Sequence, residues 1–430
     1  MTLGTTTAQG NVVLQAATDL VSKTLTSTAG AVTANSGQSM TLGTTTAQGN
    51  VVLQAATDLV STTLTSTAGA VTANSGQSMT LGATTAQGNV VLDATTKLTA
   101  TSLTSIGGAI SATSGQTMVL GMASSLTDLS VDAGTGLIAT ALSSSAGSIA
   151  AGARVGDVVI QTVDATVNGK VTAPAGQARV DAIRVGTDFT LIGFNDLSVR
   201  SGTAGRNFTL ASTGGSVTAG SLAARSVVLI APKQVTVGSV TVADSFLFGG
   251  NNVFANVYAS GGPLTGNVTG FNGAIANNVA LTLYSPGGTS MGNLRTRTAN
   301  VQVLAGPLAI ANVEVVDRAT LSNANTRVVV DQHDRSTQTG ADVQLYSAGA
   351  PFSFSMFDNH VLTNAYVPYR NAGFDSLATS GLNLSAGEAG ELALSMARNP
   401  LPTTSEQNAG TAKTPVVVTF TGFPVSLEEK

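Results

Sequence analysis

Near-identical tandem repeats occupy the start of this chain and restrict its fold more than any other feature. Residues 1–39 and 40–78 differ at a single position, Lys23 against Thr62, and residues 79–117 keep the same frame. Each 39-residue unit contains a weaker half-repeat, in which spacings of 21 and 18 residues alternate with a mean of about 19.5. This period is too short for helical-pair repeats or for a propeller blade of roughly 40 residues. It fits one coil of a parallel β-helix.

Short runs of alternating apolar and polar residues indicate strands within each coil. Val12–Ala16 (VVLQA) and Met40–Thr44 (MTLGT) are strand-like runs bounded by Gly, Asn and Thr. Alternate residues are expected to face a narrow core, while Thr and Ser face water. We expect Gly10, Gly30 and Gly37 to turn the chain at corners through positive φ angles. The predicted fold class is therefore all-β, a parallel β-helix (β-solenoid) with coils of about 19–20 residues.

Composition favours a solenoid over a set of ordinary globular domains. Only 10% of the residues are charged and 4% are aromatic, so Thr, Ser, Asn and Gln must supply the polar surface. Cysteine is absent, which excludes disulfides and thiolate metal sites. The net charge of −4 predicts no nucleic-acid partner, and the lack of an apolar run of roughly 20 residues predicts no transmembrane segment. We also predict no cofactor, no metal site and no catalytic residue.

The repeat becomes less regular along the sequence, and this change divides the chain into three segments. Residues 1–150 hold near-perfect tandem repeats, with two coils in each 39-residue unit, and residues 151–330 hold degenerate coils with loops. Residues 331–430 lose the coil frame and are interpreted as a divergent C-terminal cap, a linker and a tail, because an open solenoid edge needs covering. Met1 takes the position that Met40 holds inside the array. We therefore expect the chain to be a C-terminal fragment of a longer protein.

An aromatic group near the C-terminus is the candidate surface for a ligand or partner. Phe and Tyr begin only at Phe189, and this group consists of Phe352, Phe354, Phe357, Tyr366, Tyr369 and Phe374. Such rings could stack on glycans or dock against a protein. Phe352 and Phe354 alternate along one expected strand, and packing in a small terminal core is the favoured alternative.

Charged and hydroxyl groups elsewhere have structural interpretations that we favour. The run Asp331–Arg335 contains His333, one of two histidines, and is interpreted as a solvated or capping cluster because it has no third partner for a metal. Asp19 and Asp58 recur two coils apart, roughly 9.6 Å, which would suit an inverting hydrolase. The repeat alone explains their recurrence. Thr-rich edges are likewise interpreted as soluble β-formers and not as an ice-binding array.

The coil sequences resemble the filamentous haemagglutinin-like exoproteins of two-partner secretion, a family of large repetitive bacterial adhesins. The motifs that carry the resemblance are GNVVLQAATDL, GAVTANSGQSMTL and GRNFTLASTGGSVTAGSL, within residues 1–330. The resemblance implies a right-handed parallel β-helix that is exported by an outer-membrane transporter and is extracellular, at the bacterial cell surface. It implies a role in adhesion, aggregation or biofilm formation, with glycans or proteins of host or neighbouring cells as partners.

Self-association is the main alternative function. The first coil is almost identical to interior coils, so its exposed edge could pair with another copy. End-to-end stacking would make the chain a self-assembling extracellular filament subunit. A β-helix enzyme that acts on polysaccharides is the third alternative.

Overall fold

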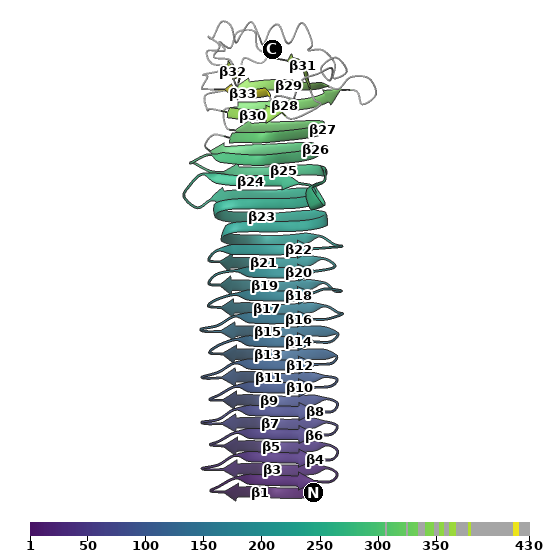
Figure 1. The fold of residues 1–430 in the computed structure, drawn as a ribbon, viewed down its shortest axis with the longest axis vertical. Coiled ribbons are helices and arrows are strands. Elements are labelled where there is room, and N and C mark those ends of the chain that lie inside the picture. Colours follow the sequence, from purple (N-terminus) through teal and green to yellow (C-terminus); the bar gives the residue numbers. More distant parts are fainter. Residues whose placement is uncertain are drawn as a thin grey trace, which may run out of the picture. The chain divides into compact units, whose positions relative to one another are not determined.

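Figure 1 shows a computed structural model of the chain, in which stacked parallel strands form a β-solenoid of about 15 turns. The prediction of an all-β parallel solenoid is confirmed. The chain divides into two compact units, Met1–Gly214 and Gly215–Lys430. Side chains are described through residue 305, Val303 excepted, and the backbone is described for residues 1–305, 308–323, 326–333, 340–347, 352–356, 361–366, 377–379 and 416–420.

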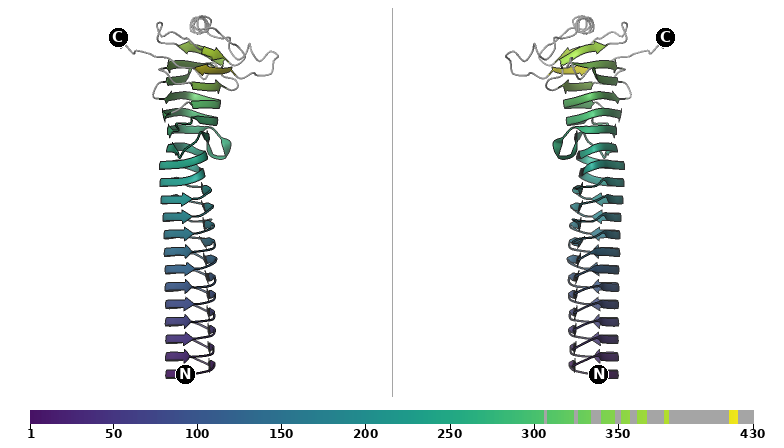
Figure 2. Two further views of the ribbon diagram at one scale, coloured as in Figure 1. Left: turned by 90° about the vertical axis from the view of Figure 1, so that its left-hand side faces the viewer. Right: turned by 90° about the vertical axis from the view of Figure 1, so that its right-hand side faces the viewer.

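Each turn of the first unit consists of one longer and one shorter strand, so its 22 strands make eleven turns. The longer strands are β1 (Thr2–Ala8), β3 (Leu20–Ser27), β5 (Met40–Ala47), β7 (Leu59–Ser66), β9 (Met79–Ala86), β11 (Leu98–Ser105), β13 (Thr117–Ser125), β15 (Gly136–Ser144), β17 (Val158–Ala165), β19 (Ala178–Val185) and β21 (Leu197–Ala204). The shorter strands are β2 (Val12–Ala16), β4 (Val32–Ser36), β6 (Val51–Ala55), β8 (Val71–Ser75), β10 (Val90–Ala94), β12 (Ile110–Ser114), β14 (Leu129–Ala133), β16 (Ile149–Ala153), β18 (Gly169–Ala173), β20 (Phe189–Gly193) and β22 (Asn207–Ser212). Longer strands pair in parallel with longer strands, and shorter with shorter (Figure 2).

The strand register corrects the spacing predicted for the half-repeat. Leu20 pairs with Met40 and Met40 pairs with Leu59, so consecutive turns differ in length by a single residue. The extra residue lies at one corner, because three residues link β1 to β2 whereas four link β3 to β4. The predicted alternation of 21 and 18 is wrong because it aligns Thr7 with Thr28, while the structure pairs Thr7 with Thr26.

The core of the first unit is a column of apolar side chains from the inward positions of its strands. Leu20, Met40, Leu59, Met79 and Leu98 occupy one such position in consecutive turns, and each is 0% exposed. Full burial of one side chain of this size contributes about 1.5–3 kcal/mol. Because each turn contacts mainly its neighbours, these contributions add along the stack.

None of the three predicted corner glycines has a positive φ angle, which corrects the prediction, and crowding explains two of them, Gly30 and Gly37. A Cβ atom at Gly37 would lie 2.0 Å from the carbonyl oxygen of Ala17 in the preceding turn, and one at Gly30 would lie 2.5 Å from Oδ1 of Asn11. A Cβ atom at Gly10 would meet nothing within 4 Å. Among the described residues, positive φ angles occur at Asn272, Gly273 and Gly288.

The second unit also uses parallel pairing, but its strands are less regular in length, and β23 (Val217–Ala259), β26 (Thr289–Ala305) and β27 (Leu308–Asn323) are much longer than any strand of the first unit. The others are β24 (Leu264–Thr269), β25 (Ala276–Tyr284), β28 (Thr326–His333), β29 (Gly340–Ser347), β30 (Phe352–Met356), β31 (Val361–Tyr366), β32 (Leu377–Thr379) and β33 (Val416–Phe420). A 3₁₀ turn, η1 (Phe271–Gly273), separates β24 from β25. From β23 to β27 the pairs are parallel, whereas β28 is antiparallel to both β27 and β29.

Candidate functional site

The predicted aromatic surface lies beyond the described side chains. Phe352 and Phe354 belong to β30 and Tyr366 ends β31, where only the backbone is described. Phe357, Tyr369 and Phe374 lie outside the described residues. Whether these rings form a binding surface or a small core therefore stays a prediction.

The histidine cluster is described only in part. His333 is the last residue of β28, and Asp334 and Arg335 lie outside the described residues. Within the part of the chain that the structure describes, no three or more His, Asp or Glu side chains gather in an arrangement that could hold a metal ion.

The recurring aspartates of the repeats bond to the backbone of the next turn. Oδ1 of Asp19 accepts a hydrogen bond from the N–H of Ser39 at 3.1 Å, and Oδ1 of Asp58 accepts one from the N–H of Ser78 at 3.1 Å. The hydroxyl of Ser78 also donates to Asp58 at 2.5 Å. A backbone N–H left without a partner away from water costs about 1–3 kcal/mol. The two carboxylates therefore stabilise the corner of the stack.

Asparagines do the same at a second corner, and we call this group the corner asparagines (Asn11, Asn50 and Asn89). Oδ1 of Asn11 accepts a hydrogen bond from the N–H of Ala31 at 2.9 Å. Asn50 and Asn89 make the equivalent bond at the same distance in later turns. One corner is thus fastened by aspartate carboxylates and the other by neutral asparagine amides.

Two exposed ion pairs join consecutive turns of the first unit. Arg154 donates to Asp132 with 2.6 Å between Nη2 and Oδ2, and Arg206 donates to Asp188. The hydrogen bond from Arg206 holds the pKa of Asp188 below its ordinary value, and hydrogen bonds from Asn207 act in the same direction against partial burial. The same contact raises the pKa of Arg206, and Asp132 raises that of Arg154. Because water screens such pairs, each contributes little to stability.

A shallow groove of about 600 Å³ crosses the ends of β15, β17, β19 and β21 in the first unit. Asp164 pairs in register with Ser143 on one side and with Arg184 on the other, and Arg184 pairs with Thr203. Asp164 and Arg184 are both exposed, and the four ion pairs of the described residues do not include them. Opposite charges lie side by side in this open groove, so its chemistry selects no ligand class.

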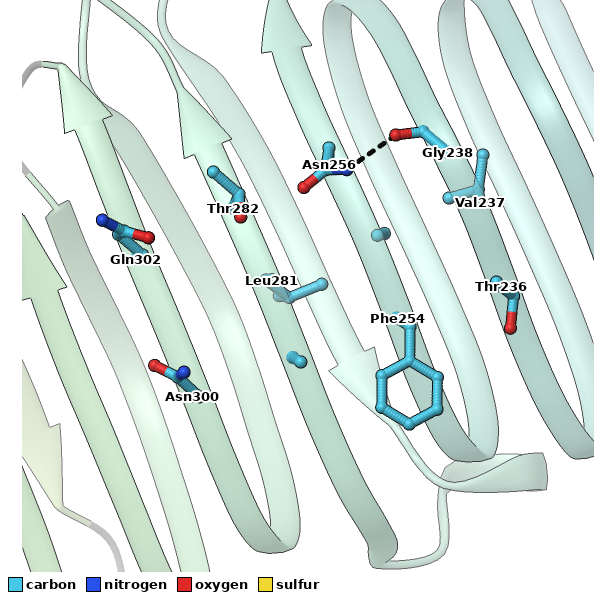
Figure 3. A pocket seen from close by; sticks show the side chains of 11 residues that line it. Thr236, Val237, Gly238, Phe254, Asn256, Leu281, Thr282, Asn300 and Gln302 are labelled. Carbon is cyan, nitrogen blue, oxygen red and sulfur yellow. Dashed lines mark hydrogen bonds between the residues drawn. The ribbon is translucent and has the colours of Figure 1, made fainter.

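A second groove, of about 260 Å³, lies on the outer face of β23, β25 and β26 in the second unit (Figure 3). Asn256, Thr282 and Gln302 occupy neighbouring positions on these three strands, and we call them the polar row. Nδ2 of Asn256 donates to the carbonyl oxygen of Gly238 at 2.7 Å, so its Oδ1 remains an acceptor. Asn300 precedes Gln302 on β26, and both are exposed. Among the side chains that the structure describes, none that lines this groove is charged.

Aromatic rings flank the polar row on both sides. Phe254, two residues before Asn256, is 37% exposed, and its ring is seen face-on in Figure 3. Tyr258, two residues after Asn256, is 37% exposed and pairs in register with Tyr284, which is 41% exposed. The two tyrosine ring centroids lie 6.3 Å apart. Exposed rings beside amide and hydroxyl groups make this groove the candidate binding site.

The sequence-based prediction missed this groove. Asn252 on β23 pairs with Asn278 on β25, and this separation of 26 along the chain is longer than any turn of the first unit. The segment that contains η1 accounts for the added length and hides the alignment of the strands in the sequence. A usable signal was present, since Tyr258 and Tyr284 each follow an alternating apolar run.

No protein-family model, no curated protein and no solved structure matches this chain. The solenoid fold is consistent with a β-helix adhesin, and the filamentous haemagglutinin-like family remains a resemblance of sequence. Within the described residues, no helix is both long and apolar enough to cross a membrane.

Proposed function

We propose that the chain is a secreted structural and adhesive scaffold at a bacterial cell surface, where it supports adhesion, aggregation or biofilm formation. The observation that carries the proposal is the regular first unit, in which eleven turns repeat one coil plan. Its corner carboxylates and amides bond to the backbone of the next turn. Side chains used in this way hold a structure together, and further turns can be added without altering existing ones.

The sequence resemblance supports the remaining parts of the proposal. By analogy with two-partner secretion, an outer-membrane transporter would export the chain, and its partners would be glycans or proteins of host or neighbouring cells. The exposed rings of the second unit give the adhesive role a physical basis, because aromatic side chains are enriched at recognition surfaces.

Adhesion of coated beads tests this role. Beads that carry the full chain should stay on bacterial or epithelial cell layers under flow more often than uncoated beads. A chain that lacks residues 40–78, one complete 39-residue repeat, serves as the matched control and should adhere equally well. Retention no higher than that of uncoated beads on every cell layer would refute the adhesive role.

We also propose that the scaffold has no catalytic activity. Asp19 and Asp58, the one recurring acidic pair that the sequence suggested for hydrolysis, are engaged in hydrogen bonds to Ser39 and Ser78. Incubation with a panel of polysaccharides should yield no reducing ends or unsaturated products above buffer. Such products from any polysaccharide would show the chain to be an enzyme.

A self-assembling filament is the second candidate function. Strands β1 and β2 have the same sequences as the interior strands β5 and β6, so an outer edge with this sequence could pair with a further coil. Negative-stain electron microscopy over a concentration series separates the two functions. Fibres that lengthen with concentration would establish self-assembly, whereas discrete particles at every concentration would exclude it.

A further inference from the structure

We propose that the groove on β23, β25 and β26 binds a neutral oligosaccharide. This inference rests on the proposed adhesive role. It adds the class of ligand that the scaffold recognises and the place where that ligand binds. Four features of the groove carry the inference: its lack of charge, its amide and hydroxyl groups, its exposed rings, and its rigid strands.

The described lining of the groove disfavours charged ligands. Its described polar side chains are Asn, Gln and Thr, and none of the described lining residues is Asp, Glu, Lys or Arg. A phosphate, a carboxylate or an ammonium group would lose water there without gaining an opposite charge, which is costly. A neutral ligand meets no such penalty.

The polar row matches the hydrogen-bonding pattern of sugar hydroxyls. Each sugar hydroxyl both donates and accepts, as do the amides of Asn256 and Gln302 and the hydroxyl of Thr282. The bond from Asn256 to the carbonyl oxygen of Gly238 orients that amide and leaves its Oδ1 free to accept. The row therefore offers both donors and acceptors along one line across three strands.

The flanking rings match the apolar faces of sugar rings. A pyranose presents C–H groups on its faces and hydroxyls around its edge, so it can pack on an aromatic ring while its edge bonds to amides. The ring of Phe254 is seen face-on in Figure 3. Tyr258 and Tyr284, which pair in register two residues beyond Asn256 and Thr282, lie just past the other end of the polar row. All three side chains project from paired strands, and strand spacing of about 4.8 Å holds them in fixed positions. Little ordering is needed on binding.

The first unit contains a matched surface that lacks the rings. Gln15, Asn35, Gln54 and Asn74 pair in register on consecutive shorter strands and form an outward amide ladder. No Phe or Tyr precedes Phe189 in the chain, so no ring flanks these amides. Variants of this ladder therefore serve as a control. They show whether outward amides bind a saccharide without aromatic rings beside them.

Binding of defined hexasaccharides to the full chain tests the inference. We expect cellohexaose, chitohexaose or mannohexaose to bind in isothermal titration, and charged hexagalacturonate not to bind. The double variant Asn300→Ala/Gln302→Ala and the variant Phe254→Ala should each weaken that binding at least about tenfold. The control Asn35→Ala/Gln54→Ala should bind like the original chain. Equal circular dichroism spectra and unfolding midpoints would show that all variants fold.

Three outcomes would overturn the site: no neutral hexasaccharide binds, hexagalacturonate binds equally well, or the groove and ladder variants lose binding alike. The bead assay with the same variants separates this failure from failure of the proposed function. Beads that adhere without any saccharide binding would leave the scaffold adhesive and refute the neutral-saccharide site. Beads that fail to adhere, while the groove still binds a saccharide and its variants do not, would refute the adhesive role and support the site.

Discussion

The corner asparagines show how single residues fasten turns in a chain with few charges. Asn11, Asn50 and Asn89 each satisfy an N–H of the following turn through a neutral amide. These asparagines recur in alternate turns, and at the equivalent corner of a later turn Oδ1 of Asp128 accepts the same bond from the N–H of Ser148 at 2.9 Å. A neutral amide therefore fills the same role as a carboxylate without adding a charge to the corner.

Replacing Asn50 by Ala should lower the free energy of unfolding by about 0.5–1.5 kcal/mol, because the N–H of Ala70 loses its acceptor at an exposed corner, where water can replace it. Urea unfolding followed by circular dichroism measures the loss. Asn35→Ala, which removes an outward amide of the ladder, is the control and should change the free energy by less than about 0.5 kcal/mol. Equal losses in the two variants would contradict a special role for the corner.

Asp188→Asn should change how the stability of the chain depends on pH. Arg206 lowers the folded-state pKa of Asp188, so the carboxylate is favoured in the folded chain. Its contribution is complete above the unfolded pKa of about 3.9 and is lost as the pH falls through the lower folded pKa. The gap in unfolding temperature between original chain and variant should therefore be present at neutral pH and shrink towards about pH 2.

The control compares the double variant Arg206→Ala/Asp188→Asn with the single variant Arg206→Ala, because the hydrogen bond from Arg206 is the first cause of the lowered pKa of Asp188. Without that arginine, the gap that depends on pH should shrink. A gap for Asp188→Asn that widened with acid would show that the sign of the pKa shift is wrong.

At the scale of the strand and its turn, backbone crowding decides where glycine is required. A Cβ atom at Gly76 would lie 2.0 Å from the carbonyl oxygen of Ala56, a backbone atom that cannot swing away. Gly10 has open space around the same position. Gly10 lies in the first turn of this chain, whereas a Cβ atom at its repeat equivalents Gly49 and Gly88 would lie 3.2 Å from backbone atoms of Gly30 and Gly69.

Gly76→Ala should destabilise the first unit by about 1–3 kcal/mol, because the backbone must shift to relieve the clash. Gly10→Ala should be neutral or stabilising by up to about 1 kcal/mol, since alanine restricts the unfolded chain. Thermal unfolding of both variants measures the difference. Similar unfolding temperatures for the two variants would contradict the crowding argument.

The strands and coils could be predicted from the sequence, because they follow from the spacing of the repeat. The register between strands could not, because it depends on which residues of successive turns are paired. Alternation within Val12–Ala16 and recurrence of the same 39-residue unit suffice for strands and coils. The register was missed because a sequence rich in Thr and Ala can be aligned with the next turn in several ways. Thr7, for example, can be aligned with Thr28 as well as with Thr26, which is its partner in the structure. The groove was missed because an irregular, longer turn brings Tyr258 beside Tyr284.

At the scale of the whole molecule, turns behave as exchangeable units. Deleting residues 40–78 removes two complete turns and joins Ser39 to Met79, which preserves the alternation of turn lengths. We expect the deletion variant to keep a β-sheet spectrum and a cooperative unfolding transition. Deleting residues 49–58 removes about half a turn, so that a longer strand would follow a longer strand. This should interrupt the stack at that point and give a lower unfolding temperature than the two-turn deletion. Equal unfolding temperatures for the two deletions would contradict a fixed coil plan.

The stacking of near-identical turns has a consequence for how the first unit would respond to tension. Each turn adds about 4.8 Å to the height of the stack, but its chain of roughly 20 residues stretches to about 65 Å when extended. Peeling turns from one end would release chain in nearly equal steps, while the remaining turns stay paired. An imposed extension would therefore be taken up in steps of similar length, and the peak force at either end of the first unit would be limited to the force that peels one turn.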